Sequence, residues 1–380
     1  MKSRSLKEWR LIKTLLLFFL ITVGYLYIAF FKDSLANGDW LSTNGYARII
    51  IPDTLLYSGI VDVNNIIESI QMSGIKNTII PSFLWVISGF DWVNLLLINI
   101  GMVYLIAFYM ERLAKQYQIP LEKARLAVVV FLLLPTTFYY SIGALKELPM
   151  ALLILASLYY YNINKFKIFL LIVLILFMVR YQLIFIILLL FLSKISHNSI
   201  RTSILLILLI SSIYPLISFL TIFSQDTTEA FRYEYGVAGS LGSIVENIRN
   251  NYIFLSTFSI LIRTFQSLFE PIIVFFKNQT FYESGDLSVW TIIHLPSNIL
   301  ISPYLYLFVK KNIFIYKNNK YIFNDVQTPF AFLTIALIFI GGFAFIHGRY
   351  LIPLYPLIII ASLIPYERMG SSNILVGTKK

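Results

Sequence analysis

The sequence contains no cysteine in its 380 residues and has only three histidines, His197, His294 and His347. The absence of cysteine excludes disulfide bonds and thiolate metal sites. The histidines are too widely scattered to suggest a metal site, and we expect the protein to use no cofactor. Charged residues are also scarce, at 13% of the chain, whereas soluble domains average about 25%. This shortage of charge excludes an ordinary soluble globular domain.

Hydrophobic residues make up 58% of the sequence, and they gather in separate runs of near-spanning length. Such runs predict helices, because a membrane β-barrel would show short alternating segments instead. The net charge of +11 comes mostly from basic residues in short segments beside these runs. This is the positive-inside pattern of membrane proteins and argues against a nucleic-acid partner. We therefore predict an all-α, polytopic protein embedded in the lipid bilayer.

The basic segments predict about ten transmembrane helices in a single domain, residues 1–380, with both termini in the cytoplasm. Two large polar segments, 32–78 and 224–288, are then outer loops, and we expect interfacial helices within them. The first apolar run, 15–31, precedes no small-residue cleavage site. We interpret it as a retained helix rather than a signal peptide.

The apolar run 168–193 is interrupted in its middle by Arg180 and allows two interpretations. A single helix would put Arg180 near the bilayer centre, at a cost of about 2.5 to 3.5 kcal/mol, and would invert every later loop. A hairpin of two short helices with Arg180 at its outer tip avoids both problems, and we favour it. Each half would rise only about 18 to 20 Å, so this tip would lie below the membrane surface.

A second charged tip separates the apolar runs 328–346 and 351–364, each long enough or nearly so to cross the bilayer. The sequence there predicts a transmembrane hairpin with His347 and Arg349 at its tip. Arg349 then either holds an anion at the mouth of a cavity or reaches to lipid headgroups, and the sequence favours neither alternative.

A third tight outer turn, 141–147, carries Lys146 beside Glu147. Arginine presents a planar fork of donors that matches phosphate oxygens, and lysine adds a point charge. Cations at three hairpin tips of similar depth therefore predict a diphosphate site, to which Arg232 and Arg263 of the second outer loop can contribute. The simpler interpretation of Lys146 is a local ion pair with Glu147.

Asp39 lies in the first outer loop, in Gly38-Asp39-Trp40. A carboxylate on an outer loop can act as general base on an acceptor hydroxyl in glycosyl transfer. The alternative is an aspartate that caps a helix or orders the loop.

Five short motifs together resemble bacterial membrane glycosyltransferases of the GT-C type, and most of all the oligosaccharide repeat-unit polymerases of O-antigen and capsule. The motifs are Gly38-Asp39-Trp40, the turn Tyr140-Ser141-Ile142-Gly143-Ala144-Leu145-Lys146-Glu147, the hairpin around Arg180, Arg263-Thr264-Phe265-Gln266-Ser267-Leu268-Phe269-Glu270-Pro271, and Gly348-Arg349-Tyr350-Leu351-Ile352-Pro353-Leu354. The resemblance covers the chain in outline.

The resemblance implies a hexosyltransferase of the bacterial inner membrane that works in surface polysaccharide or lipopolysaccharide biosynthesis. Its substrate would be an undecaprenyl-diphosphate-linked oligosaccharide, whose diphosphate Arg180, Arg263 and Arg349 would bind. Asp39 would be the base, or a positioning residue, since polymerases of this kind often act without an acidic base. Trp40 stands where a second acidic residue would complete a metal-binding pair. A chain-length regulator protein is the partner that the resemblance suggests.

Two other functions fit the same composition. A flippase or transporter would move the lipid-linked oligosaccharide without making bonds, although transporters usually show duplicated halves, and this sequence has no internal repeat. A structural scaffold of an envelope complex would tolerate every charge substitution among the residues above.

Overall fold

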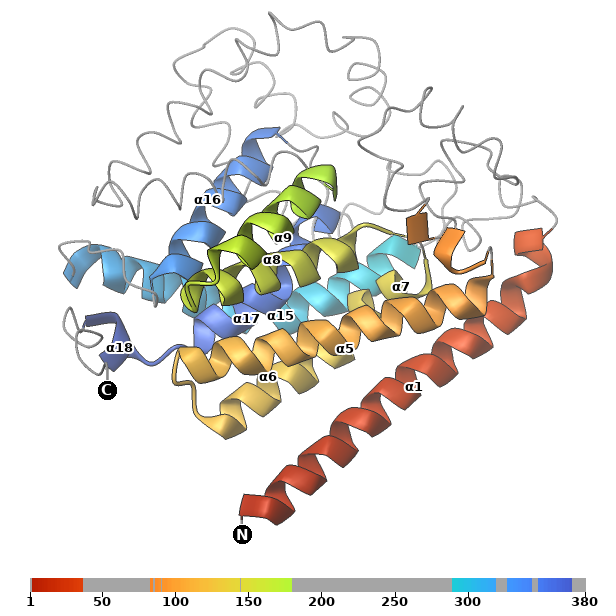
Figure 1. Cartoon of the computed structure of the whole chain (residues 1–380), viewed down its shortest axis with the longest axis horizontal. Helices are drawn as coiled ribbons and strands as arrows, with labels where there is room; N and C mark the ends of the chain where they lie inside the picture. The colour runs from red at the N-terminus through yellow and green to blue at the C-terminus, as the bar shows by residue number, and fades with distance from the viewer. Residues whose placement is uncertain are drawn as a thin grey trace, which may run out of the picture. The chain divides into compact units, whose positions relative to one another are not determined.

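The structure is a computed structural model of the chain, shown in Figure 1. It describes residues 2–36, 83–84, 86–89, 91–143, 145–179, 289–318, 327–343 and 348–370. In chain order the elements are α1 (Lys2–Ala36), α5 (Trp92–Gln116), α6 (Leu121–Leu133), α7 (Pro135–Ile142), α8 (Glu147–Asn162), α9 (Phe166–Val179), α15 (Val289–Asn318), α16 (Thr328–Phe343), the 3₁₀ helix η4 (Gly348–Leu354), α17 (Tyr355–Leu363) and α18 (Tyr366–Gly370). No strand occurs in these ranges, which confirms the predicted all-α class.

The chain divides into two compact units. The first comprises Met1–Phe185, Ser288–Val309 and Ile352–Pro365, and the second Ile186–Leu287, Lys310–Leu351 and Tyr366–Lys380. The described part of the second unit contains α16, α18 and the end of α15. There the Lys311 ammonium lies 5.1 Å from the centroid of the Tyr366 ring, and the Phe314 ring meets the same ring edge-on.

Two helices are long and apolar enough to cross a membrane, α1 over Lys7–Ala29 and α5 over its whole length. A third span results if α6 and α7, which are bent by 54° at their junction, form one broken crossing. The run 15–31, which was expected to be a retained helix, lies within α1. The ten-helix topology remains a prediction, because the described residues contain only these two or three candidates.

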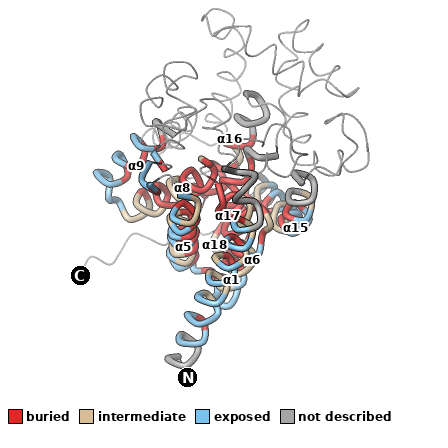
Figure 2. Tube along the Cα trace, turned by 90° about the vertical axis from the view of Figure 1, so that its right-hand side faces the viewer, coloured by how far each residue is buried: buried red, intermediate tan, exposed pale blue. Residues whose placement is uncertain are grey.

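The core of the first unit forms around α5, α8 and α17, which contact one another. Helix α8 has no charged residue after Glu147, and buried side chains cover most of its circumference. A helix that is apolar all round belongs in a core. In contrast, α9 buries the stripe Phe169, Ile172, Val173 and Leu176 and exposes large leucines on its other side. Figure 2 shows a similar difference between helices: many residues of α1 and α9 are exposed, whereas those of α17 are buried.

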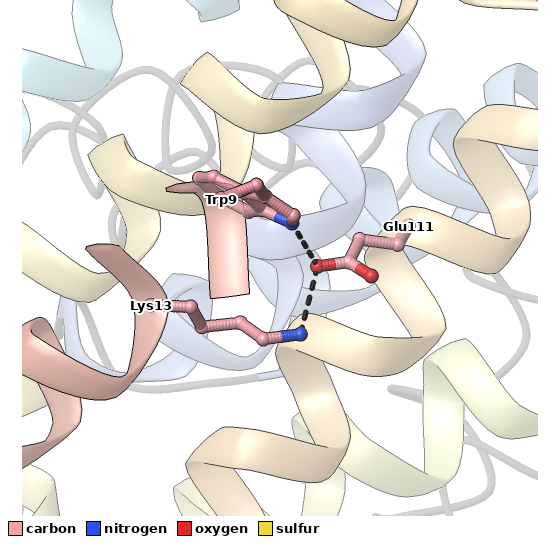
Figure 3. Close-up of polar contacts among 3 residues, drawn as sticks. All are labelled: Trp9, Lys13 and Glu111. Carbon is pink, nitrogen blue, oxygen red and sulfur yellow. Dashed lines mark hydrogen bonds and ion pairs between the residues drawn. The ribbon is translucent and has the colours of Figure 1, made fainter. Parts of the chain in front are cut away.

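Helix α1 is tied to the other helices near its beginning. The Trp9 indole, only 8% exposed, donates from Nε1 to Glu111 Oε1 of α5 over 3.1 Å (Figure 3). The Arg125 guanidinium of α6 lies 5.6 Å from the centroid of the Trp9 ring, a distance at which a cation is attracted to an aromatic face. These contacts place a polar cluster at one end of α1, α5 and α6.

The apolar run 351–364, which the sequence predicted to span the membrane, is not a single α-helix. Its first part belongs to η4, and the α-helix that follows, α17, has nine residues. The helical part of the run, Leu351–Leu363, is shorter than either of the two candidate spans. Pro353 lies within η4 and lacks the N–H that an α-helix would need at that point. Every residue from 351 to 362 is buried, so this run is part of the protein core.

Candidate functional site

The helical backbone is interrupted between α6 and α7. Leu134 has an extended backbone (φ −62°, ψ 126°), and Pro135 begins α7. Proline disfavours the α conformation of the preceding residue, so a break at Leu134 is expected from the sequence alone. The Thr137 hydroxyl donates to the carbonyl oxygen of Phe131 over 2.7 Å, an oxygen that also accepts the Leu134 N–H over 3.3 Å, and so links the two helices across the break.

The start of α7 is held by a side chain of α15. The backbone N–H of Thr136 donates to Ser297 Oγ over 3.0 Å, and both residues are fully buried. A buried backbone N–H at the first turn of a helix has no partner within that helix. Ser297 therefore supplies the acceptor that α7 itself cannot provide.

The end of α7 is held by a side chain of α5. Asn99 is fully buried, and its Nδ2 donates to the carbonyl oxygens of Ser141, over 2.9 Å, and of Gly143, over 2.8 Å. Gly143 is extended, so the chain leaves the helix there and turns toward α8. The turn between α7 and α8 is thus bonded through its main chain to one position on α5.

This position lies well inside the length of α5. Asn99 follows Trp92, the first residue of α5, by seven residues, which corresponds to about 10 Å along the helix. At the other end of the two helices, Asn162 Nδ2 donates to Gln116 Oε1 over 3.2 Å and to the Tyr117 hydroxyl over 2.9 Å. The carboxyl-terminal ends of α5 and α8 therefore lie together, so the two helices are parallel and level at this end. Because α8 has 16 residues and α5 has 25, the α7–α8 turn is recessed at the opposite end.

Two charged residues stand at this recessed turn. Lys146 is the N-cap residue of α8 and is half-buried, and Glu147 is the first residue of α8 and only 3% exposed. A carboxylate in the first turn of a helix is favoured by the partial positive charge of that end. The turn therefore presents a half-buried cation beside a buried carboxylate, and the cation is a candidate for anion binding.

A second buried polar contact lies in the same unit. The Tyr355 hydroxyl of α17 donates to Asn298 Oδ1 of α15, and Asn298 is adjacent to Ser297. Neither Asn99 nor these residues were predicted from the sequence to belong to a site. The available signal was an amide or hydroxyl inside an apolar run, since polar groups at such positions are costly unless they find partners.

Of the predicted site residues, the structure describes Lys146 fully and Arg349 only as the second residue of η4. Asp39, Arg180, Arg232, Arg263 and His347 lie outside the described residues. Their expected convergence, and the choice between a hairpin and a single helix around Arg180, remain predictions. Within the ranges that the structure describes, no group of three histidines, aspartates or glutamates is arranged to hold a metal ion.

Comparison of the chain with protein-family models, with curated proteins and with solved structures finds no match.

Proposed function

We propose that the protein is a membrane glycosyltransferase that joins undecaprenyl-diphosphate-linked oligosaccharide units on the outer face of the bacterial inner membrane. The observation that carries the proposal is the recessed α7–α8 turn, which brings Lys146 and Glu147 about 10 Å below the end of α5. We propose that the diphosphate of the lipid-linked donor binds at this turn.

The orientation follows from the basic residues. Arg112, Lys115, Lys123 and Arg125 gather around the end of α5 and the start of α6. The positive-inside rule assigns that end to the cytoplasm. The recessed turn then opens toward the outer face, as does the polar segment 32–78. In this proposed orientation the amino terminus would be in the cytoplasm, as in the ten-helix topology that we continue to propose.

In the proposed reaction, a sugar hydroxyl of the acceptor attacks the anomeric carbon of the donor sugar. The bond from that carbon to the diphosphate oxygen breaks, and the undecaprenyl diphosphate leaves with the electron pair. Lys146, together with Arg180, Arg349, Arg263, Arg232 and His347, would stabilise the charge of the leaving diphosphate. Asp39 would accept the proton of the attacking hydroxyl.

The experiment is a complementation assay of surface polysaccharide length in a deletion strain. Lys146→Met, Arg180→Ala and Arg349→Ala should each shorten the polymer strongly while the protein remains in the membrane. Lys123→Met, which removes an exposed lysine from the proposed cytoplasmic side, is the matched control and should leave the length unchanged. Long polymer in the Arg180→Ala and Arg349→Ala strains together would refute the assignment of the site.

A flippase for the same lipid-linked oligosaccharide is the second candidate. The observation that favours it is the broken pair α6–α7, since discontinuous helices form the substrate sites of many transporters. The deletion strain distinguishes the two functions. Single repeat units on the cell surface indicate loss of a polymerase, whereas the absence of all surface glycan indicates loss of a flippase.

A further inference from the structure

We infer that Asn99 is a positioning residue: its side-chain amide sets the depth of the α7–α8 turn and thereby the location of Lys146. The consequence for a lipid diphosphate rests on the proposed function. The position of the turn is independent of the proposed function and can be measured separately.

The geometry of α7 makes the turn dependent on an outside partner. Helix α7 has only eight residues, with a break before it and an extended glycine after it. The last four carbonyls of any helix lack partners within that helix. Asn99 donates to two carbonyls of this segment, those of Ser141 and Gly143, from one nitrogen. It therefore fixes the place at which the chain leaves α7.

The chemistry of the two contacts calls for this residue type. A primary amide carries two N–H donors on a single nitrogen, which can point at two carbonyl oxygens at once. Aspartate has nearly the same size as asparagine but would set its own oxygens against both carbonyls. Leucine would fill a similar volume with no donor. Glutamine would keep both donors on an arm that is longer by one methylene group.

Asn162 serves as a control for a purely structural role of Asn99, because it also joins α5 and α8. Asn162 also uses its Nδ2 for two hydrogen bonds between α8 and the α5 segment, to Gln116 Oε1 and to the Tyr117 hydroxyl. It lies at the level end of the pair, far along the chain from Lys146. If amide contacts merely hold α5 and α8 together, loss of either asparagine should have the same effect. If Asn99 positions the turn, only its loss should move Lys146.

The absence of cysteine from the chain allows a direct measurement. With Lys146→Cys as the sole cysteine, the rate of modification by a membrane-impermeant methanethiosulfonate reports how accessible this position is from outside the cell. We expect Asn99→Asp to change this rate at least fivefold, and Asn162→Asp to leave it within twofold. Asn99→Gln, which keeps both donors, provides the second variant if Asn99→Asp does not reach the membrane, and it should also change the rate.

Equal rates in the parent and in the Asn99 variants, or equal changes with Asn99→Asp and Asn162→Asp, would overturn the inference. A second readout uses Lys146 intact. Because a misplacement of about 1 Å can cost about a hundredfold in rate, Asn99→Asp should shorten surface polysaccharide where Asn162→Asp does not. A changed labelling rate with unchanged polysaccharide would support the positioning role and contradict the proposed glycosyltransferase, so the two failures are distinguishable.

Discussion

Lys13 Nζ of α1 lies 3.0 Å from Glu111 Oε1 of α5, the same oxygen that accepts the hydrogen bond of the Trp9 indole (Figure 3). The lysine side chain is 12% exposed and the glutamate 31% exposed. The ammonium also lies 5.2 Å from the centroid of the Tyr104 ring. One carboxylate therefore joins two consecutive turns of α1 to α5.

We expect Lys13→Met to lower the free energy of unfolding by about 0.5 to 1 kcal/mol, because the ion pair is only partly screened by solvent. Glu111→Gln should cost more, since Trp9 and Lys13 both lose a charged acceptor. Thermal unfolding of the purified protein in detergent measures both effects. Lys123→Met, at an exposed lysine in the first turn of α6, is the control. Effects of Lys13→Met and Trp9→Phe that add in the double variant would show that the two donors do not share one acceptor energetically.

Ser297→Ala should destabilise the first unit by about 1 to 3 kcal/mol, because the buried N–H of Thr136 would lose its acceptor. Ser302→Ala is a matched control on the same helix. The Ser302 side chain is exposed, and its hydroxyl donates only to the carbonyl of Ile299 within α15. The melting temperatures in one detergent should therefore separate the two variants. Equal melting temperatures would mean that Ser297 does not support the start of α7.

Ile359→Ala tests whether α17 belongs to the core. Ile359 is fully buried, and removal of a buried isoleucine side chain costs about 2 to 5 kcal/mol. The comparison is Leu171→Ala on α9, where the leucine is 58% exposed, and a substitution at such a site changes stability by about 0.5 kcal/mol or less. A thermal shift of similar size in both variants would instead support a membrane-facing α17.

The two interpretations of the segment around Arg180 predict different sides of the membrane for the residues that follow it. The hairpin predicts that residues 194–201 face the cytoplasm. Asn198→Cys, as the sole cysteine, should resist an impermeant thiol reagent in intact cells and react after permeabilisation. Reaction in intact cells would favour a single helix across the membrane, with Arg180 near its centre and all later loops inverted.

The features that the sequence predicted correctly depend on neighbours in the chain. The break at Leu134 follows from the restriction that Pro135 places on its predecessor. The spanning length of α1 and α5 follows from unbroken apolar composition. The return of the chain at residues 141–147 was also predicted, and α7 ends at Ile142 while α8 begins at Glu147.

The features that it missed depend on residues distant in the chain. The run 351–364 is as apolar as a helix that faces lipid, and hydropathy cannot distinguish such a helix from one surrounded by protein. Asn99 was visible as an amide within an apolar run, but its acceptors lie 42 and 44 residues further on. Nothing in the local sequence indicates that these carbonyls need donors from α5.

By itself, the sequence determined that this protein is helical and has helices suited to a membrane, because apolar length and proline position act on the chain locally. Only the tertiary structure decided which apolar run is buried in protein and how far the α7–α8 turn is recessed. Both depend on packing between distant helices, where backbone groups without local partners must find donors and acceptors on whichever side chains lie beside them.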